Sequence, residues 1–279
     1  MKEYILLIIK GMIIGLANVI PGVSGGTLMI TLGIYEQVID TISHFFKNFK
    51  KNLKFIIPLG IGVVLSLLVF SKIIGISLDK YPFATTLFFL GLIIGGLPII
   101  VRNLNKNKDS KKVSNYIIAF LSFAFIILFA MLKSGSDINL NVSFLGLVLL
   151  FIVGVVAAGT MVIPGISGSF VLMLLGYYKP IIDTVRNITD FSLIGHNIII
   201  LGSFGIGVLV GIIGVAKLIE LLLKKFETKT YYAVFGFVLA SCIAIIKPLF
   251  SINLGIGEIV IGILLLLIGT FCSYKLSNI

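Results

Sequence analysis

The chain contains one helix-breaking motif twice, as Val-Ile-Pro-Gly-Val-Ser-Gly-Gly-Thr at residues 19–27 and as Val-Ile-Pro-Gly-Ile-Ser-Gly-Ser at residues 162–169. Each copy lies near the middle of a long apolar region, 5–43 in the first case and 143–186 in the second. Proline removes a backbone donor and clashes with the preceding helical turn, while glycine lets the chain reverse. Each apolar region is therefore predicted to form a helix hairpin rather than one straight span.

The regions around the two motifs are copies of one another. A shift of 143 positions aligns 11–42 with 154–185 without a gap, and 13 of the 32 aligned positions are identical. The identities include proline, glycine, serine, tyrosine and aspartate, which shared apolar composition does not explain. The similarity continues at an offset of 145 in the segments that follow. The chain is therefore predicted to be a duplication with halves 1–135 and 143–279.

The composition indicates an integral membrane protein. Of 279 residues, 58% are hydrophobic and 12% are charged, and the mean hydropathy is +1.19. Soluble domains carry about 25% charged residues, and disordered chains are richer still in polar groups. In so apolar a chain, a net charge of +11 indicates cytoplasmic loops that face anionic lipid rather than a nucleic-acid partner. The two cysteines lie in apolar stretches and indicate neither a disulfide framework nor a metal site.

Six further stretches are long enough to cross a bilayer, whose core of roughly 30 Å takes about 20 apolar residues of helix. They are 55–77, 83–101 and 114–132 in the first half, and 197–223, 231–248 and 257–274 in the second. Each half is thus predicted to be a re-entrant or broken-helix hairpin followed by three transmembrane helices, in an all-α fold. Arm 5–20 would rise only about 24 Å, which favours a re-entrant hairpin. Whether the hairpin arms span fully stays open.

The placement of lysine and arginine predicts the orientation. If both hairpins leave by the side they enter and the N-terminus is inside, 14 basic residues fall in cytoplasmic segments and 5 in outer segments. If each region crossed once instead, the better orientation would give 12 and 7. The hairpin arrangement is favoured, with both termini and the loop 102–112 cytoplasmic. Three spans per half is an odd number, so the second half is predicted to be inverted, an architecture typical of transporters.

The motifs have the chemistry of an anion site. In each copy Pro-Gly reverses the chain and a serine follows at the expected N-cap of the next helix. Such a helix start offers free N–H groups and a partial positive charge, and glycines let a phosphate approach the backbone. The predicted phosphate-binding residues are Ser24, Gly25, Gly26, Thr27, Ser167, Gly168 and Ser169, after helix breaks at Pro21, Gly22, Pro164 and Gly165. The alternative is that these small residues only permit close helix packing.

Ionisable residues inside the apolar regions are further candidates, because such groups are costly in a membrane. Those considered for head-group attraction or proton coupling are Glu36, Asp40, Asp183, Lys72 and Lys217. For the two aspartates the alternative is a solvated carboxylate at the interface, and for the two lysines it is a snorkelling side chain. Glu36 is replaced by Lys179 in the second copy, so a proton carrier there would act in one half only. His44 and His196 are expected at the interface rather than as ligands.

The sequence indicates no enzyme. It contains no His-Glu-x-x-His, no Cys-x-x-Cys and no Walker loop, and two isolated histidines cannot build a His-rich phosphatase site. Residues 22–26 superficially match a nucleophile elbow, but that motif needs a preceding strand and a partner histidine and acid. We therefore expect no catalytic residue, no cofactor and no metal.

Residues 15–27 and 162–169 give the chain a resemblance to the bacterial polyprenyl-phosphate transporter family, the PopT type, long catalogued only as a domain of unknown function. The resemblance covers essentially the whole chain. It implies translocation of undecaprenyl phosphate, the C55 lipid carrier, from the outer to the cytoplasmic leaflet of the bacterial plasma membrane, for reuse in cell-wall polymer synthesis.

Several features of this function stay open. Ser169 and Phe170 stand where the first copy has Gly26 and Thr27, so the two tips need not bind phosphate equally. The alternative function is a secondary transporter or channel for a small soluble anion, which would need a closed central pathway. The coupling ion and the oligomeric state are not readable from the sequence.

Overall fold

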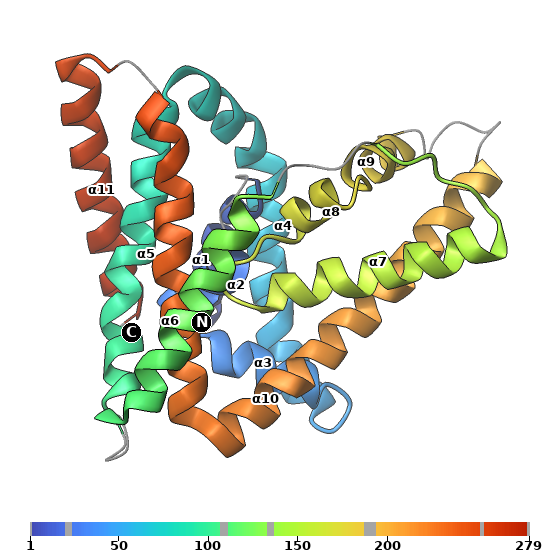
Figure 1. Cartoon of the computed structure of the whole chain (residues 1–279), viewed down its shortest axis with the longest axis horizontal. Coiled ribbons are helices and arrows are strands. Elements are labelled where there is room, and N and C mark those ends of the chain that lie inside the picture. Colours follow the sequence, from blue (N-terminus) through green and yellow to red (C-terminus); the bar gives the residue numbers. More distant parts are fainter. Residues whose placement is uncertain are drawn as a thin grey trace.

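The computed structural model describes residues 2–19, 24–106, 111–132, 137–186, 194–251 and 254–277, and no strand occurs among them (Figure 1). The first half forms α1 (Lys2–Val19), α2 (Gly25–Thr31), α3 (Tyr35–Ser43), α4 (Phe49–Lys80), α5 (Pro82–Leu104) and α6 (Val113–Ala130). The second half forms α7 (Phe144–Val162), α8 (Gly168–Leu174), α9 (Tyr178–Arg186), α10 (Ile194–Ile246), a 3-10 turn (Lys247–Ser251) and α11 (Ile256–Ser277).

Five of the described helices, α5, α6, α7, α10 and α11, are long and apolar enough to cross a membrane. The predicted span 197–223 lies within α10, and the predicted span 231–248 lies within it as far as Ile246. The backbone of α10 leaves helical geometry at Phe226 (φ −136°, ψ 43°). Below, the first and second parts of α10 are those before and after Phe226. The predicted span 55–77 lies within α4. The predicted class, an all-α integral membrane protein, is confirmed.

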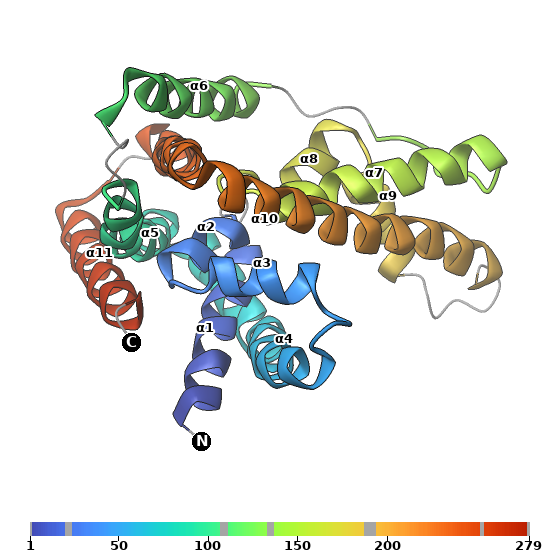
Figure 2. The same cartoon turned by 90° about the horizontal axis from the view of Figure 1, so that it is seen from below.

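The two halves repeat the same local packing. The shift of 143 carries the bounds of α2 onto α8 and those of α3 onto α9. α1 packs along α4, and α7 packs along the first part of α10 (Figure 2). A Cβ added at Gly11 would collide with the backbone of Leu59, and one at Gly154 with the backbone of Phe204. These glycines therefore mark equivalent close helix crossings, as small residues commonly do in membranes.

The last helix of each half packs on the other half. α11 lies beside α5, and α6 lies beside the second part of α10 (Figures 1 and 2). Gly91 on α5 fits against the backbone of Leu266, and its repeat counterpart Gly236 fits against the backbone of Ala119. The halves are therefore interlocked through an exchanged pair of helices.

Each hairpin has a second break that the sequence analysis did not predict. Gly33 separates α2 from α3 and Gly176 separates α8 from α9, with φ of 71° and 75°. Glycine adopts this left-handed conformation without a steric cost. The signal was present as an identical Leu-Gly pair at 32–33 and 175–176. Because α7 is itself long enough to cross a membrane, length does not make that arm re-entrant, and the re-entrant arrangement stays a prediction.

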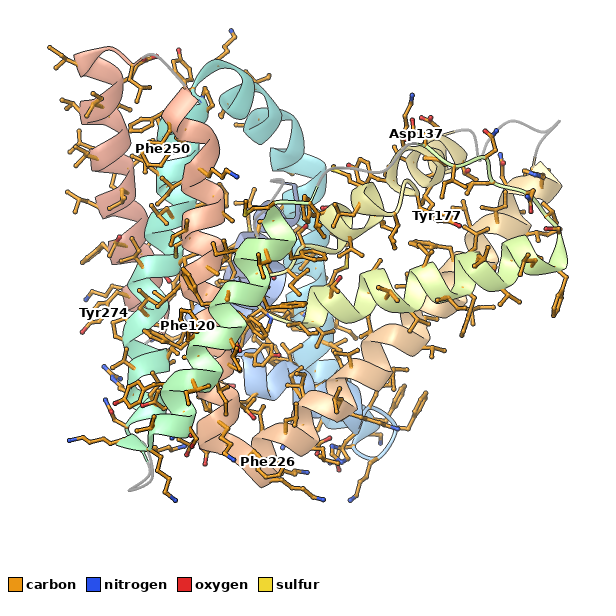
Figure 3. The ribbon with its side chains drawn as sticks, viewed as in Figure 1. Phe120, Asp137, Tyr177, Phe226, Phe250 and Tyr274 are labelled. Carbon is orange, nitrogen blue, oxygen red and sulfur yellow. The ribbon has the colours of Figure 1, made fainter. Side chains whose placement is uncertain are left out.

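The core and the outer surface are both apolar. Leu28 and Leu32 around α2 and Phe89 and Ile93 on α5 have no exposed surface. Outward-facing side chains include Phe120 on α6, Phe250 after α10 and Tyr274 on α11, all exposed (Figure 3). An outer surface this apolar fits contact with lipid rather than with water.

Candidate functional site

The two motifs meet where α2 begins. Ser24 Oγ donates a hydrogen bond to the carbonyl oxygen of Ile163 at 3.5 Å, and the N–H of Gly165 donates to Thr27 Oγ1 at 2.8 Å. Ser24 is 1% exposed and Thr27 is 0% exposed. Pro21 and Gly22 lie outside the described residues. The structure thus brings Ser24 and Thr27 of the first copy onto Ile163 and Gly165 of the second.

In the first copy, these contacts occupy the hydroxyl groups that the sequence analysis assigned to phosphate. Gly26 also lies against the second copy, since an added Cβ would stand 3.2 Å from the carbonyl oxygens of Met161 and Val162. In this conformation Ser24, Gly26 and Thr27 hold the two hairpin tips together. The close-packing alternative therefore describes part of what these residues do.

The second copy is arranged differently. Ser167 is the N-cap of α8, as Ser24 is of α2, with φ of −96° and −92° and ψ of 127° and 126°. Neither serine side chain accepts a hydrogen bond from its own helix. Ser167 Oγ lies 2.7 Å from Ser169 Oγ, and both residues are half-buried. This pair of hydroxyls is the more accessible of the two sets.

Pro164 and Gly165 form the turn between α7 and α8, and Gly165 has a φ of 84°. An added Cβ at Gly165 would lie 2.8 Å from the carbonyl oxygen of Phe237, so the turn fits closely against the second part of α10. Gly168 is buried against α7, where an added Cβ would lie 2.7 Å from the carbonyl oxygen of Ala157. The second motif is therefore held between α7 and α10.

An apolar groove of about 490 Å³ begins at the second motif. It is bounded by Ile163 and Pro164 on one side and by both parts of α10, including Leu218 and Phe226, on the other. Lys229 and Thr230 are its polar lining residues, and Lys229 Nζ lies 5.7 Å from the ring centroid of Phe226. The groove exists because α10 bends at Phe226. The sequence signal for that bend was the charged interruption at 224–229 between two apolar runs.

Two tyrosines fix α3 to its neighbours. Tyr35 Oη donates to the carbonyl oxygen of Val162, the first residue of the second motif, at 3.0 Å. Tyr231 Oη on α10 donates to the carboxylate of Glu36. The sequence analysis assigned no role to either tyrosine, although Tyr35 is one of the positions matched between the halves. Glu36 is thus an exposed residue whose carboxylate is anchored to α10.

Asp40 belongs to an ion-pair network between α3 and the first part of α10. His44 Nδ1 lies 3.2 Å from Asp40 Oδ1, and His44 Nε2 lies 3.7 Å from Glu220 Oε1. Lys224 pairs with the same carboxylate of Glu220. Because a lysine already neutralises Glu220, we interpret the cluster as a tie between helices rather than as a metal site.

The other ionisable candidates are dispersed. Asp183, the repeat counterpart of Asp40, lines a separate pocket of about 360 Å³ with Lys179 and His196. Lys217 is exposed on α10 and is not among the lining residues of the apolar groove. Lys72 lies in α4, and its side chain is outside the description. Of the two whose side chains are described, Asp183 lines a pocket apart from the motifs and Lys217 does not line the groove beside them.

Comparison with known proteins shows to which family the chain belongs. The model of the undecaprenyl phosphate translocase-like family matches residues 14–252, which include both motifs, the groove and all helices from α2 to α10. The chain belongs to this family. The resemblance inferred from the motifs is confirmed.

Two curated relatives support the assignment. The chain is 31% identical over 246 residues to the polyprenyl-phosphate transporter of Staphylococcus aureus (strain NCTC 8325 / PS 47), covering 87% of this chain and 86% of the relative. It is 28% identical over 254 residues to the polyprenyl-phosphate transporter of Vibrio cholerae serotype O1, covering 86% and 76%. No solved structure matches. The family is one of transporters and not of enzymes, as the sequence predicted.

Proposed function

We propose that this protein translocates undecaprenyl phosphate from the outer to the cytoplasmic leaflet of a bacterial plasma membrane, for reuse in cell-wall polymer synthesis. The observation that carries the proposal is that a pair of half-buried hydroxyls, Ser167 and Ser169, follows directly on a turn whose Pro164 lines an apolar groove. A lipid phosphate needs such a pair of surfaces, because its head group requires polar partners while its tail stays in an apolar environment.

The head group is proposed to bind the motif residues in two stages. Ser167, Gly168 and Ser169 are the first partners, since the hydroxyls of the two serines are hydrogen-bonded to each other and, in the described part of the chain, to no other group. Ser24 and Thr27 are the later partners, because they must first leave Ile163 and Gly165. As it passes, the phosphate would accept hydrogen bonds from the Ser24 hydroxyl and the Gly165 N–H, while the Ile163 carbonyl would give up its donor.

The proposed orientation puts both termini in the cytoplasm and inverts the second half. The end of α5, the α3–α4 turn and the bend of α10 lie at one end of the molecule, opposite the α4–α5 junction (Figure 1). These three segments carry many of the lysines, and Lys106 pairs with Glu227 across 3.4 Å. Basic segments are retained on the cytoplasmic side of membranes, which supports the proposed orientation.

The test is a leaflet assay with the purified protein in liposomes. Labelled undecaprenyl phosphate placed in one leaflet should reach the other faster with protein than without it. The double variant Ser167→Ala and Ser169→Ala should slow this exchange several-fold. Ser203→Ala is the matched control, because its hydroxyl bonds Leu147 on α7 away from the motif. Passage of sulfate or inorganic phosphate without lipid exchange would instead support the soluble-anion alternative.

A further inference from the structure

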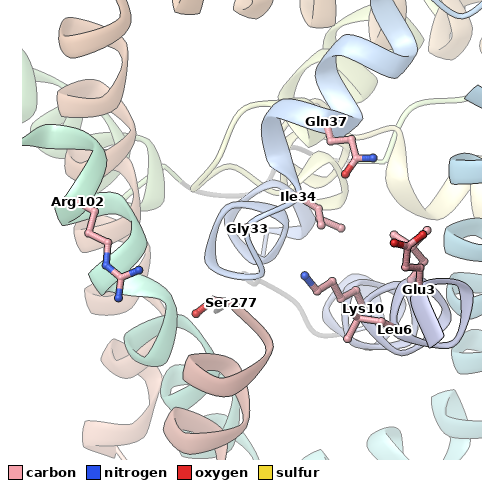
Figure 4. Close-up of a pocket in the computed structure, with 9 residues that line it drawn as sticks. Glu3, Leu6, Lys10, Gly33, Ile34, Gln37, Arg102 and Ser277 are labelled. Atoms are coloured by element: carbon pink, nitrogen blue, oxygen red, sulfur yellow. The ribbon is translucent and has the colours of Figure 1, made fainter. Parts of the chain in front are cut away.

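A polar pocket of about 580 Å³, lined by none of the motif residues, lies between α1 and the ends of α5 and α11 (Figure 4). It is bounded by α1, by the turn between α2 and α3, and by the C-terminal ends of α5 and α11. The residues that matter here are Glu3, Lys10, Gly33, Gln37, Arg102 and Ser277. Because α11 belongs to the second half, this pocket depends on the exchange of helices between halves.

Lys10 is the unusual residue of this pocket. It lies on the apolar helix α1 and is only 6% exposed. Its amino group points across the pocket toward the side that carries Ser277 and Arg102 (Figure 4). Within the described part of the chain no carboxylate forms an ion pair with it, and the carboxylate of Glu3 lies two turns away on the same helix. Lys10 thus has little exposed surface and no described counter-charge, so an anionic ligand in the pocket would offset the cost of desolvating its ammonium.

The opposite wall of the pocket supplies a second cation. Arg102 lies in the last turn of α5 with its side chain exposed, and a guanidinium presents paired N–H donors that match a phosphate. Gly33, at a φ of 71°, lines the same pocket, and a Cβ added there would lie 2.9 Å from Cδ1 of Ile99. With Lys10 and Arg102 positive and Glu3 negative, the lining has a net charge of one positive unit.

The surroundings of the pocket suit a ligand with an apolar tail. On the same helix as Lys10, α1 exposes Tyr4, Ile5 and Ile9, at 43%, 53% and 40% of their surface. A chain attached to a bound phosphate could leave the pocket past Leu6 and Leu7, which line it on α1, and reach this apolar surface in contact with lipid.

We propose that this pocket binds a phosphate group between Lys10 and Arg102, as a second site for the head group after it leaves the motifs. The inference rests on the proposed function, since it supplies the next binding position on the way to the basic end of the molecule. The chemistry recognised is a phosphate, which a lipid phosphate and free inorganic phosphate share.

Native mass spectrometry of the purified full-length chain tests the pocket. The wild type should retain two equivalents of undecaprenyl phosphate, and undecaprenol, which lacks the phosphate, should not bind this way. Lys10→Met should weaken the second equivalent about tenfold or more, the loss expected for a charge-assisted contact. Arg102→Gln should weaken it less, while Lys10→Arg should largely restore it. The matched control is Lys50→Met, which removes an exposed lysine of α4 that does not line the pocket.

Inorganic phosphate distinguishes the two sources of the ligand. If it displaces the second equivalent at concentrations equal to those of the lipid, the pocket is a site for free phosphate. If it does not, the pocket is a site for the lipid head group. Lys10→Met should also raise or preserve the midpoint of thermal unfolding, because it removes an unpaired buried charge.

Unaltered binding of both equivalents in Lys10→Met would overturn the pocket proposal, as would a single equivalent that Lys10→Met leaves unchanged. Neither result touches the proposed function, which the leaflet assay of the wild type decides. Conversely, suppose that the wild type exchanges no lipid between leaflets, and that it binds phosphate while Lys10→Met does not. These results would refute the transport proposal and support the anion pocket.

Discussion

The two copies of the Pro-Gly-x-Ser-Gly motif have nearly the same sequence and the same backbone angles at their N-cap serines, yet their side chains have different partners. In the first copy, Ser24 and Thr27 are buried and hydrogen-bonded to the backbone of the second copy. In the second, Ser167 and Ser169 are half-buried and bonded to each other. A duplicated site is therefore unequal in any one conformation, because one tip must supply the surface on which the other rests. Exchange between two such states is what a transporter with repeated halves requires.

The largest effect is expected in a test of the predicted opposite orientation of the two copies in the membrane. In a background without Cys242 and Cys272, Lys111→Cys and Asn139→Cys place single exposed thiols in the loops at opposite ends of α6. We expect only Asn139→Cys to react with a membrane-impermeant maleimide added to intact cells, because the lysine-rich loop is cytoplasmic. Reaction of both thiols from outside would rule out the inverted arrangement.

The next largest effect, on transport and on stability, is expected from a larger side chain at Gly26 in the first copy. Gly26→Val adds a branched side chain where even an added Cβ would lie 3.2 Å from the carbonyl oxygens of Met161 and Val162. Overpacking of this kind costs about 1–3 kcal/mol, so we expect transport in the liposome assay to be nearly abolished and the thermal midpoint to fall. Its repeat counterpart Ser169→Val should reduce transport only several-fold. Equal effects at the two positions would show that the copies are equivalent in use.

Thr27→Val separates packing from hydrogen bonding, since it keeps the shape and removes the acceptor of the Gly165 N–H. An unsatisfied donor in this place costs about 1–3 kcal/mol, and the thermal unfolding midpoint in detergent should fall by several degrees. If the midpoint does not change, the contact between the tips does not stabilise this conformation.

The smallest effect on stability is expected from Ser167→Ala. In the described part of the chain its hydroxyl bonds to Ser169 alone, so we expect the midpoint to stay within error of the wild type while lipid exchange slows several-fold. Ser24→Ala should instead lower the stability, by about 1 kcal/mol, because it removes a hydrogen bond at a buried site. A stability loss in Ser167→Ala as large as that in Ser24→Ala would contradict the asymmetry.

Local properties of the sequence determined the helices and their breaks. Apolar length predicted the spans that became α5, α6, α10 and α11, and the loss of a backbone donor at Pro164 predicted the end of α7. The matched serines were placed correctly at two N-caps, because an N-cap depends on only a few neighbouring residues. The duplication was equally visible, since it needs only comparison of the chain with itself.

Only the tertiary structure decided what those elements do together. The partners of Ser24 and Thr27 lie 139 and 138 residues away, and no periodicity encodes a contact over that distance. The same holds for the exchange of α6 and α11, for the groove that the bend at Phe226 creates, and for the pocket in which Lys10 and Arg102 share one cavity. Lys10 was plain in the sequence as a charge on an apolar helix. Its proposed contact with phosphate depends on the ends of α5 and α11 lying next to it. The positions of these helix ends are set by packing across the whole molecule.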